Sequence, residues 1–159
     1  MKKIVGILLI ISLLISCKNS KKKETENKSE SENELTQTEL IKSESNQTEL
    51  IVQQILDLPK LQWIYHPELK ERLPVKIMET EHIKKNFNLT KFEQKVRILT
   101  LEELDKEEIK DYVIFDILEI KTDTTDFKLF YKIEGAGCRG KFLNDNGEWR
   151  ILDYSVWEN

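Results

Sequence analysis

Hydrophobic residues divide this chain of 159 residues into three zones. Residues 4–15 are almost unbroken apolar sequence, and residues 18–48 are almost wholly polar. Beyond residue 48, apolar and polar positions alternate with the periods of helices and strands. All three Trp, all four Tyr and all six Phe lie after residue 47. Because large apolar side chains build a core, the pattern predicts one folded domain over residues 47–159, a length sufficient for a single core.

The first part of that domain has helical spacing. Apolar residues recur at intervals of three and four after Asn46, which can cap a helix with Glu49 as its capping-box partner. A second short helix is expected to begin at Asp57, with Pro59 in its first turn, and to end before Pro67. Both helices present an apolar side, so we expect both to pack on the core.

Shorter elements are expected in the middle of the domain. Alternation over residues 74–80 predicts an edge strand, and residues 96–99 predict a second strand after a loop at residues 87–92. The sequence Thr100-Leu101-Glu102-Glu103 is a capping box and predicts a further helix. The apolar side of that helix would hold Leu101, Leu104 and Ile109.

The last third of the domain predicts a sheet. Strong turn signals, of which Asn146-Gly147 is the clearest hairpin signal, separate four alternating segments. The four predicted strands are residues 112–121, 127–134, 139–144 and 148–157. Connections this short force neighbouring strands to be antiparallel. The predicted fold class is therefore α+β, with N-terminal helices followed by an antiparallel sheet that ends in a four-strand meander.

This order of elements resembles the cystatin-like and nuclear transport factor 2-like class of α+β domains. The closing Gly-Glu-Trp-Arg-Ile-Leu-Asp-Tyr of residues 147–154 looks like the final hairpin of such domains, the ketosteroid-isomerase and SnoaL-like members included. The resemblance covers residues 47–159 in topology. It implies a curved antiparallel sheet that wraps around the helices.

The N-terminal zone has the parts of an export signal. Lys2 and Lys3 precede the apolar run, which is shorter than the about 20 residues of a membrane-spanning helix and fits a signal peptide. The run ends in Leu14-Ile15-Ser16-Cys17, which resembles the lipobox of bacterial lipoproteins. The resemblance implies that residues 1–16 are a signal peptide and that Cys17 becomes the acylated first residue of the mature chain.

The same resemblance implies a location. Cys17 would carry a thioether-linked diacylglycerol and an amide-linked acyl chain, and two or more chains anchor a protein stably. The membrane is then a partner through acylated Cys17, in the bacterial cell envelope. Lys18 stands where an acidic residue would retain a lipoprotein at the inner membrane, which favours the outer membrane, facing the periplasm or the cell surface. An ordinary cleaved signal and an uncleaved anchor are the alternatives.

Residues 17–46 are predicted to form a disordered tether. After Cys17 they hold no aromatic residue, Gly or Pro, so they cannot bury enough surface to offset chain entropy. The segment also contains a slipped duplication, because Lys28-Ser29-Glu30-Ser31 recurs at residues 42–45. A flexible spacer of this length has a mean reach of about 30 Å and would hold the domain away from the membrane.

The charge balance excludes one class of partner. The chain has 25 basic and 29 acidic residues, a formal charge of −4. Removal of residues 1–16, which contain two lysines and no acid, makes the charge −6. Nucleic-acid-binding proteins show a basic excess or stripe, so no nucleic-acid partner is expected.

Asp116 is the strongest candidate for acid–base chemistry. Simple alternation along residues 112–121 would place its carboxylate among apolar and aromatic side chains, where an unpaired charge is costly. A pKa raised by such a pocket would suit a general base, as in ketosteroid-isomerase-like sites, with Tyr112 or Tyr131 as the oxyanion donor. The other interpretation is an open face with a cross-strand ion pair. The possible partners of Asp116 are then Lys132, Arg139 and Arg150.

The other reactive residue types do not form a recognisable centre. His66 and His82 are the only histidines and lack metal-ligand spacing. Cys138 has no nearby histidine in sequence to activate it, and we expect it to be a small buried hydrophobe. No metal or cofactor is expected.

Trp149 and Trp157 are expected on one strand face and mainly in the core, with an exposed aromatic patch as the functional alternative.

Two functions stay open. The first function is a non-enzymatic envelope lipoprotein that binds a protein, peptide or glycan. The second is a small-molecule-binding protein or acid–base enzyme with a pocket near Asp116.

Overall fold

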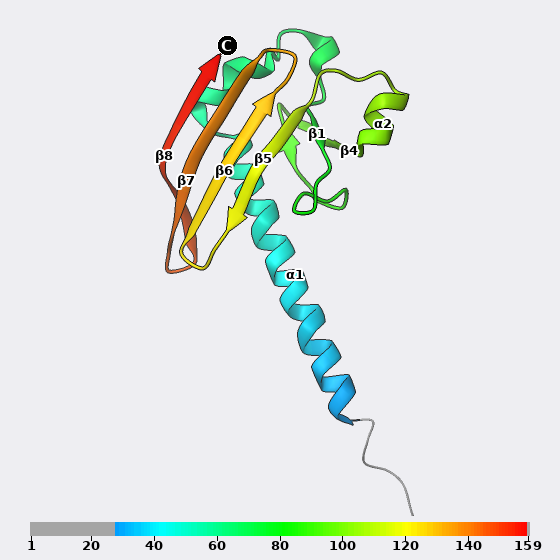
Figure 1. Cartoon of the computed structure of the whole chain (residues 1–159), viewed down its shortest axis with the longest axis vertical. Coiled ribbons are helices and arrows are strands. Elements are labelled where there is room, and N and C mark those ends of the chain that lie inside the picture. Colours follow the sequence, from blue (N-terminus) through cyan, green and yellow to red (C-terminus); the bar gives the residue numbers. More distant parts are fainter. Residues whose placement is uncertain (1–27, 159) are drawn as a thin grey trace, which may run out of the picture. The chain divides into compact units, whose positions relative to one another are not determined.

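The computed structural model describes the backbone of residues 28–158 and all side chains in that range except those of residues 28–36, 40 and 41. The expected signal peptide, Cys17 and the first part of the expected tether lie outside these residues. The described residues divide into two units between Thr36 and Gln37. The second unit holds every strand described below (Figure 1). Within residues 28–158, no helix has both the length and the apolar character needed to cross a membrane.

Helix α1 (Lys28–Leu56) begins earlier than the sequence predicts. Residues 28–46 form helix where a disordered tether is expected, and Asn46 lies inside the helix instead of capping it. The segment has no Gly or Pro to stop a helix and contains five Glu, and it extends a helix that is already nucleated. Glu49, the expected capping-box partner, accepts a hydrogen bond from the backbone N–H of Asn88 at 3.1 Å.

Two short 3-10 helices follow, η1 (Pro59–Tyr65) and η2 (Lys70–Arg72). The first lies where a short helix is predicted, and its buried residues are Leu61, Ile64 and Tyr65. Trp63, on its other side, is 46% exposed. Asp57 does not cap η1, because its carboxylate instead binds the Lys91 ammonium at 2.7 Å.

Six strands form one open, mostly antiparallel sheet in the order β4-β1-β5-β6-β7-β8. Strand β1 (Lys76–Met78) pairs in parallel with both β4 (Arg97–Leu99) and β5 (Val113–Ile120). The prediction of β1 as an edge strand is therefore wrong, and β4 takes that place. All three β1 residues are buried or half-buried, as expected for a parallel strand covered on both faces. A separate hairpin, β2 (Thr90–Lys91) with β3 (Gln94–Lys95), precedes β4.

The last four strands pair antiparallel in chain order, close to the predicted positions. They are β5, β6 (Thr124–Tyr131), β7 (Ala136–Asp145) and β8 (Glu148–Glu158). The β5–β6 register shifts at Asp116 and the β7–β8 register shifts at Leu152. Each shift inserts one unpaired residue, so the side chains beyond it change faces relative to simple alternation.

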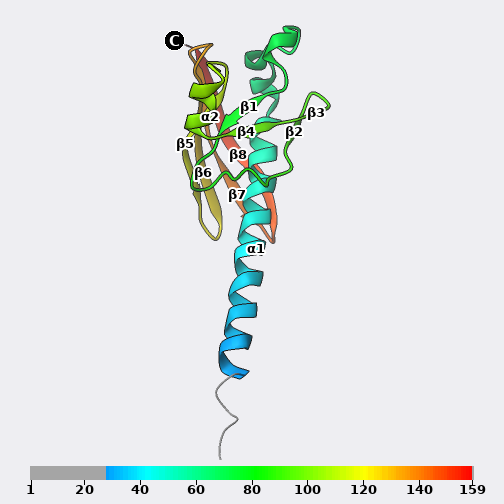
Figure 2. The same ribbon diagram turned by 90° about the vertical axis from the view of Figure 1, so that its right-hand side faces the viewer.

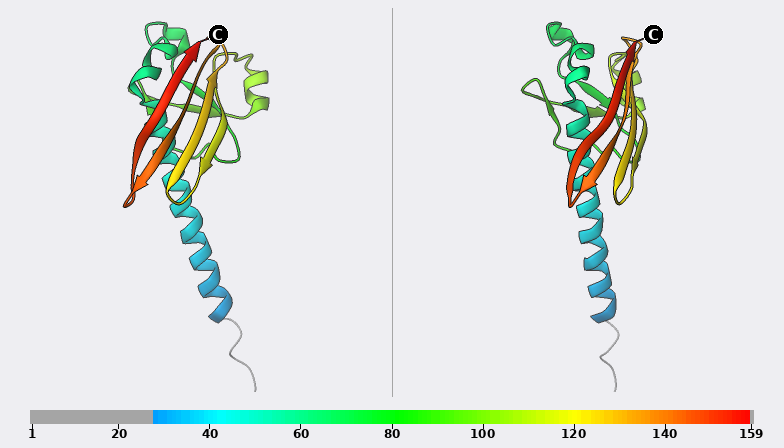
Figure 3. Two further views of the ribbon diagram at one scale, coloured as in Figure 1. Left: turned by 60° about the vertical axis from the view of Figure 1, so that its left-hand side comes forward. Right: turned by 90° about the vertical axis from the view of Figure 1, so that its left-hand side faces the viewer.

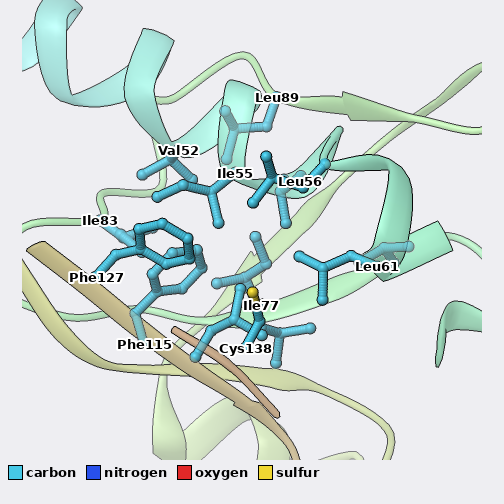
Figure 4. Close-up of a cluster of buried hydrophobic side chains, with 14 of the residues drawn as sticks. Val52, Ile55, Leu56, Leu61, Ile77, Ile83, Leu89, Phe115, Phe127 and Cys138 are labelled. Atoms are coloured by element: carbon cyan, nitrogen blue, oxygen red, sulfur yellow. The ribbon is translucent and has the colours of Figure 1, made fainter. Parts of the chain in front are cut away.

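One face of the sheet packs on α1 and η1, which lie beside it in Figure 2. Figure 4 shows Val52 and Ile55 of α1 facing Phe115 and Phe127 of the sheet, with the Cys138 sulfur among them. Cys138 is fully buried, which confirms the expectation for this thiol. The sequence is therefore folded around one main core, and the chain is α+β.

Helix α2 (Leu101–Lys106) begins at the predicted capping box of Thr100 and Glu103, which is confirmed. Leu104 is buried, but Leu101 is 57% exposed, contrary to the prediction. A helix of six residues contacts the sheet along one narrow side, and Leu104 occupies it. The resulting small cluster contains Leu99, Leu104 and Tyr112, with Met78, Ile109 and Ile114 packed against them.

Candidate functional site

Asp116 lies at the bulge of β5, with its carboxylate 40% exposed. It accepts a hydrogen bond from the Lys128 ammonium at 2.8 Å. The expectation of an apolar environment is wrong because the bulge between Phe115 and Ile117 breaks the alternation, and the buried face resumes at Leu118. The structure has the alternative arrangement, a cross-strand ion pair, with a lysine other than the three predicted partners.

The two candidate oxyanion donors belong to different clusters. Tyr131 lies in the main core, whereas Tyr112 lies in the small cluster at α2. The Tyr131 hydroxyl donates to Asp111, and the Lys132 ammonium lies 5.9 Å from the centre of the Tyr112 ring. Burial, together with the bond to Asp111, raises the pKa of Tyr131. The structure therefore does not bring Asp116, Tyr112 and Tyr131 together.

Asp111 instead holds a buried ion pair. Its carboxylate lies 3.0 Å from the Lys76 ammonium, and the two side chains are 16% and 9% exposed. Lys76 also donates to the backbone carbonyl of Arg72 at 3.0 Å. Because an unpaired buried cation costs several kcal/mol, these contacts anchor the segment around η2 to the sheet.

A second ion pair, Arg72 with Glu134, lies mostly buried and joins η2 to the β6–β7 turn. His66 lies 3.4 Å from Glu134 and 2.8 Å from Glu68. The bond from His66 lowers the pKa of Glu68. Burial alone would lower the pKa of Arg72, but hydrogen bonds to Tyr131 and Glu134 raise it overall. These contacts connect the end of η1 and η2 to the β6–β7 turn.

The cysteine and the second histidine lie apart. Burial raises the pKa of the Cys138 thiol to about 12, which keeps it protonated and unreactive. The His82 side chain is 53% exposed beside Glu81. Within the described part of the chain, no group of three or more His, Cys, Asp and Glu residues is placed to hold a metal ion.

The exposed face of β5–β8, which we call the outer face, points away from α1 (Figure 3). Strand register aligns Ile114, Phe130, Gly137 and Trp157 in one row across it, here called the aromatic row. The three side chains are each half-buried. A Cβ at Gly137 would lie 2.2 Å from Cζ2 of Trp157, so the indole ring occupies the space above the glycine. The ring therefore covers the β7 position of the row.

The next row of the outer face contains two cations. It consists of Ile117, Lys128, Arg139 and Ser155. Lys128 is engaged by Asp116, whereas Arg139 is exposed and makes no side-chain ion pair or hydrogen bond with the described residues. The third row is Glu119, Asp126, Lys141 and Asp153. The unpaired cation Arg139 thus lies beside the aromatic row, and the carboxylates of Asp126 and Asp153 lie farther from it.

A shallow hollow of about 580 Å³ lies between these two charged rows. Its lining includes Ile117, Lys128, Arg139, Lys141, Asp153 and Ser155. The hollow is open to solvent, whereas sites for small molecules bury most of the ligand surface. The outer face therefore suits contact with a macromolecule better than enclosure of a metabolite.

Simple alternation does not predict the aromatic row. It places Trp149 and Trp157 on the same face of β8, which is wrong because the bulge at Leu152 separates them. Trp149 is 8% exposed in the core, whereas Trp157 lies on the outer face opposite Gly137. The glycine within a strand was the one local signal, since such a glycine often marks close approach of another group.

No protein-family model, curated protein or solved structure matches this chain. The lipobox resemblance and the cystatin-like resemblance therefore gain no support from known proteins. Function has to be inferred from the residues and geometry described above.

Proposed function

We propose that this chain is a lipid-anchored lipoprotein of the bacterial cell envelope and that its folded domain is a non-enzymatic binding module. The anchor rests on Leu14-Ile15-Ser16-Cys17 at the end of the apolar run. In this proposal acylated Cys17 holds the chain in a membrane, which is the outer membrane, facing the periplasm or the cell surface. The module's partner is an envelope protein, peptide or glycan.

The contrast between the two sheet faces supports the binding role. The inner face is filled by α1 and η1, whereas the outer face leaves the aromatic row half-exposed beside the unpaired Arg139. Apolar surface rimmed by polar groups is typical of interaction sites. The exposed pair of Asp116 with Lys128 favours binding over acid–base catalysis, because the carboxylate is engaged by a cation at the surface and is not enclosed in an apolar pocket.

We also propose that the sheet is a curved sheet of the cystatin-like and nuclear transport factor 2-like kind, with β5–β8 as its meander. The bulges at Asp116 and Leu152 support this, because bulges bend strands and increase their twist. The parallel pairing of β1 with β4 and β5 is a departure from an antiparallel sheet. The likeness is therefore restricted to α1, η1 and β5–β8.

The anchor is tested by comparing Cys17→Ser with Cys138→Ala in the full chain, expressed in a bacterium that acylates lipoproteins. The unmodified chain and Cys138→Ala should incorporate labelled palmitate and sediment with membranes. Cys17→Ser should do neither, because it removes the acylated sulfur. Membrane retention and labelling of Cys17→Ser equal to those of the unmodified chain would refute the anchor.

The binding role is tested by photo-crosslinking in intact cells. A photoreactive amino acid replaces Ser155 on the outer face or, as the control, Gln94 of the exposed β2–β3 hairpin. We expect a discrete adduct only from position 155. No adduct from position 155, or the same adducts from both positions, would contradict a binding role for the outer face.

A further inference from the structure

We propose that the aromatic row and Arg139 together dock an acidic, apolar protein segment, one that presents an aromatic or aliphatic side chain flanked by Asp or Glu. This inference rests on the proposed binding role of the outer face and names the chemistry of its partner. It follows from three features: the half-buried apolar row, the cations beside it, and the distribution of charge over the rest of the face.

The apolar contact is supplied by Phe130 and Trp157. Both side chains are half-buried, and the Trp157 ring lies over Gly137, which pairs with Phe130 on its other side. The indole ring therefore covers the β7 position of the row, between Phe130 and the Trp157 backbone in the register. Aromatic side chains at this degree of exposure are typical anchors of protein interfaces, where they bury large area at little cost in side-chain freedom.

The charge contact is supplied by cations on both sides of the row. Arg139 lies one row away from Trp157 and Phe130 and has no carboxylate partner. Lys132 follows β6 on the opposite side and contacts the Tyr112 ring, again without a carboxylate within ion-pair distance. A guanidinium without a partner matches a carboxylate in two parallel hydrogen bonds. The free charges next to the apolar row are therefore positive.

The remaining charges restrict where an acidic segment can lie. Asp126 and Asp153 stand in the third row, about 7 Å beyond Arg139, since rows on one face repeat every two residues. Lys141 binds Asp126 at 3.0 Å, which leaves Asp153 free to repel a carboxylate. An acidic segment is thus favoured over the aromatic row and disfavoured at the far end of the face.

A glycan is the competing partner, because sugars also contact exposed aromatic rings. The unpaired Arg139 favours the acidic protein segment, since a neutral sugar leaves the guanidinium unmatched. The two partners predict different responses to charge. Binding of an acidic segment should weaken as the salt concentration rises, because salt screens exposed charges. It should also depend on the sign of the charge at position 139.

The test uses the full chain in detergent micelles and three fluorescent heptapeptides measured by anisotropy. The first alternates Glu with Phe, the second has Lys in place of Glu, and the third has Ser in place of Phe. The Glu–Phe peptide should bind at least about tenfold more tightly than either of the others. Its affinity should fall as the salt concentration rises.

Two charge reversals locate the site on the outer face. Arg139→Glu should lower the affinity for the Glu–Phe peptide by about tenfold or more. Arg150→Glu is the matched control, because Arg150 is exposed on another row and is already bound to Glu148 at 2.8 Å. It should leave the affinity unchanged. Both variants should keep the melting temperature, since both side chains are exposed.

Several outcomes would overturn the inference. Equal binding of the Glu–Phe and Lys–Phe peptides, or equal effects of the two arginine variants, would show that charge at Arg139 does not select the partner. Tighter binding of a neutral soluble polysaccharide such as dextran than of the Glu–Phe peptide would assign the face to a glycan, which overturns this inference but not the proposed binding role. Absence of binding by every probe, with no adduct from position 155, would remove both the inference and the binding role.

Discussion

The indole ring of Trp157 occupies the space above Gly137, where a Cβ would lie 2.2 Å from the ring atom Cζ2. Gly137 and Trp157 are paired directly in the β7–β8 register. A side chain at position 137 would have to share this space with the ring. The contact therefore links a strand glycine to the position of the ring at the β8 end of the aromatic row.

Gly137→Ala should reduce the free energy of unfolding by about 1–3 kcal/mol, the usual cost of forcing a methyl group into occupied space. Chemical denaturation of the full chain measures the loss. In a Trp157→Val background the same change should cost less, because the ring is absent. An equal loss in both backgrounds would show that the ring does not restrict position 137.

Asp111→Ala should be strongly destabilising, by about 3 kcal/mol or more, because it leaves the buried Lys76 without a counter-charge. It also removes the acceptor of the Tyr131 hydroxyl. Urea denaturation gives the value, and the exposed Asp105→Ala is the control with little expected effect. A double variant, Lys76→Met with Asp111→Leu, should recover most of the loss. Failure of Asp111→Ala to destabilise would contradict the anchoring role of this pair.

Cys138 should resist thiol reagents in the folded chain. Its pKa of about 12 leaves almost no thiolate near neutral pH, and the side chain is fully buried. In a Cys17→Ser background, labelling by an aromatic disulfide reagent should be at least about 100-fold slower than in the chain unfolded by guanidinium. Rapid labelling of the folded chain would show that the thiol is accessible.

Glu103 should contribute to acid sensitivity. A hydrogen bond from Lys85 (2.6 Å) and one from the Thr100 backbone N–H (2.8 Å) lower its pKa from 4.5 to about 2. Since the folded-state pKa is the lower one, the stabilisation is present above about pH 4.5 and is lost as the pH falls toward 2. Glu103→Gln should make the melting temperature depend less on pH within this window. Glu102→Gln, the control in the same turn, should not.

Asp116→Asn should change the free energy of unfolding by less than about 1 kcal/mol, as is usual for exposed ion pairs. The carboxylate and the Lys128 side chain are each 40% exposed, so the remaining lysine stays hydrated. Added salt should reduce the difference between the variant and the unmodified chain. A loss of several kcal/mol would mean that Asp116 is buried in solution and would reopen the case for an acid–base site.

Much of the secondary structure was predictable because its signals are local. The alternation and turn residues of the last third predict the positions of β5–β8, and the capping box at Thr100 predicts the start of α2. The burial of Cys138 follows from its type and its strand. Helix α1 is the exception, because its polar first part predicts disorder, whereas a segment without Gly or Pro can extend a helix that packing has already nucleated.

The site was less predictable because it depends on which strand residues lack a partner. The chain by itself sets where strands begin and end, along with the lipobox-like segment at Cys17. Only the folded sheet decides that Asp116 and Leu152 are unpaired, and hence that Asp116 faces solvent and Trp149 and Trp157 separate. Side chains alternate with period two only while the pairing is continuous, and a single inserted residue reverses every face beyond it. Insertion is set by contacts between strands distant in sequence, which local patterns do not contain.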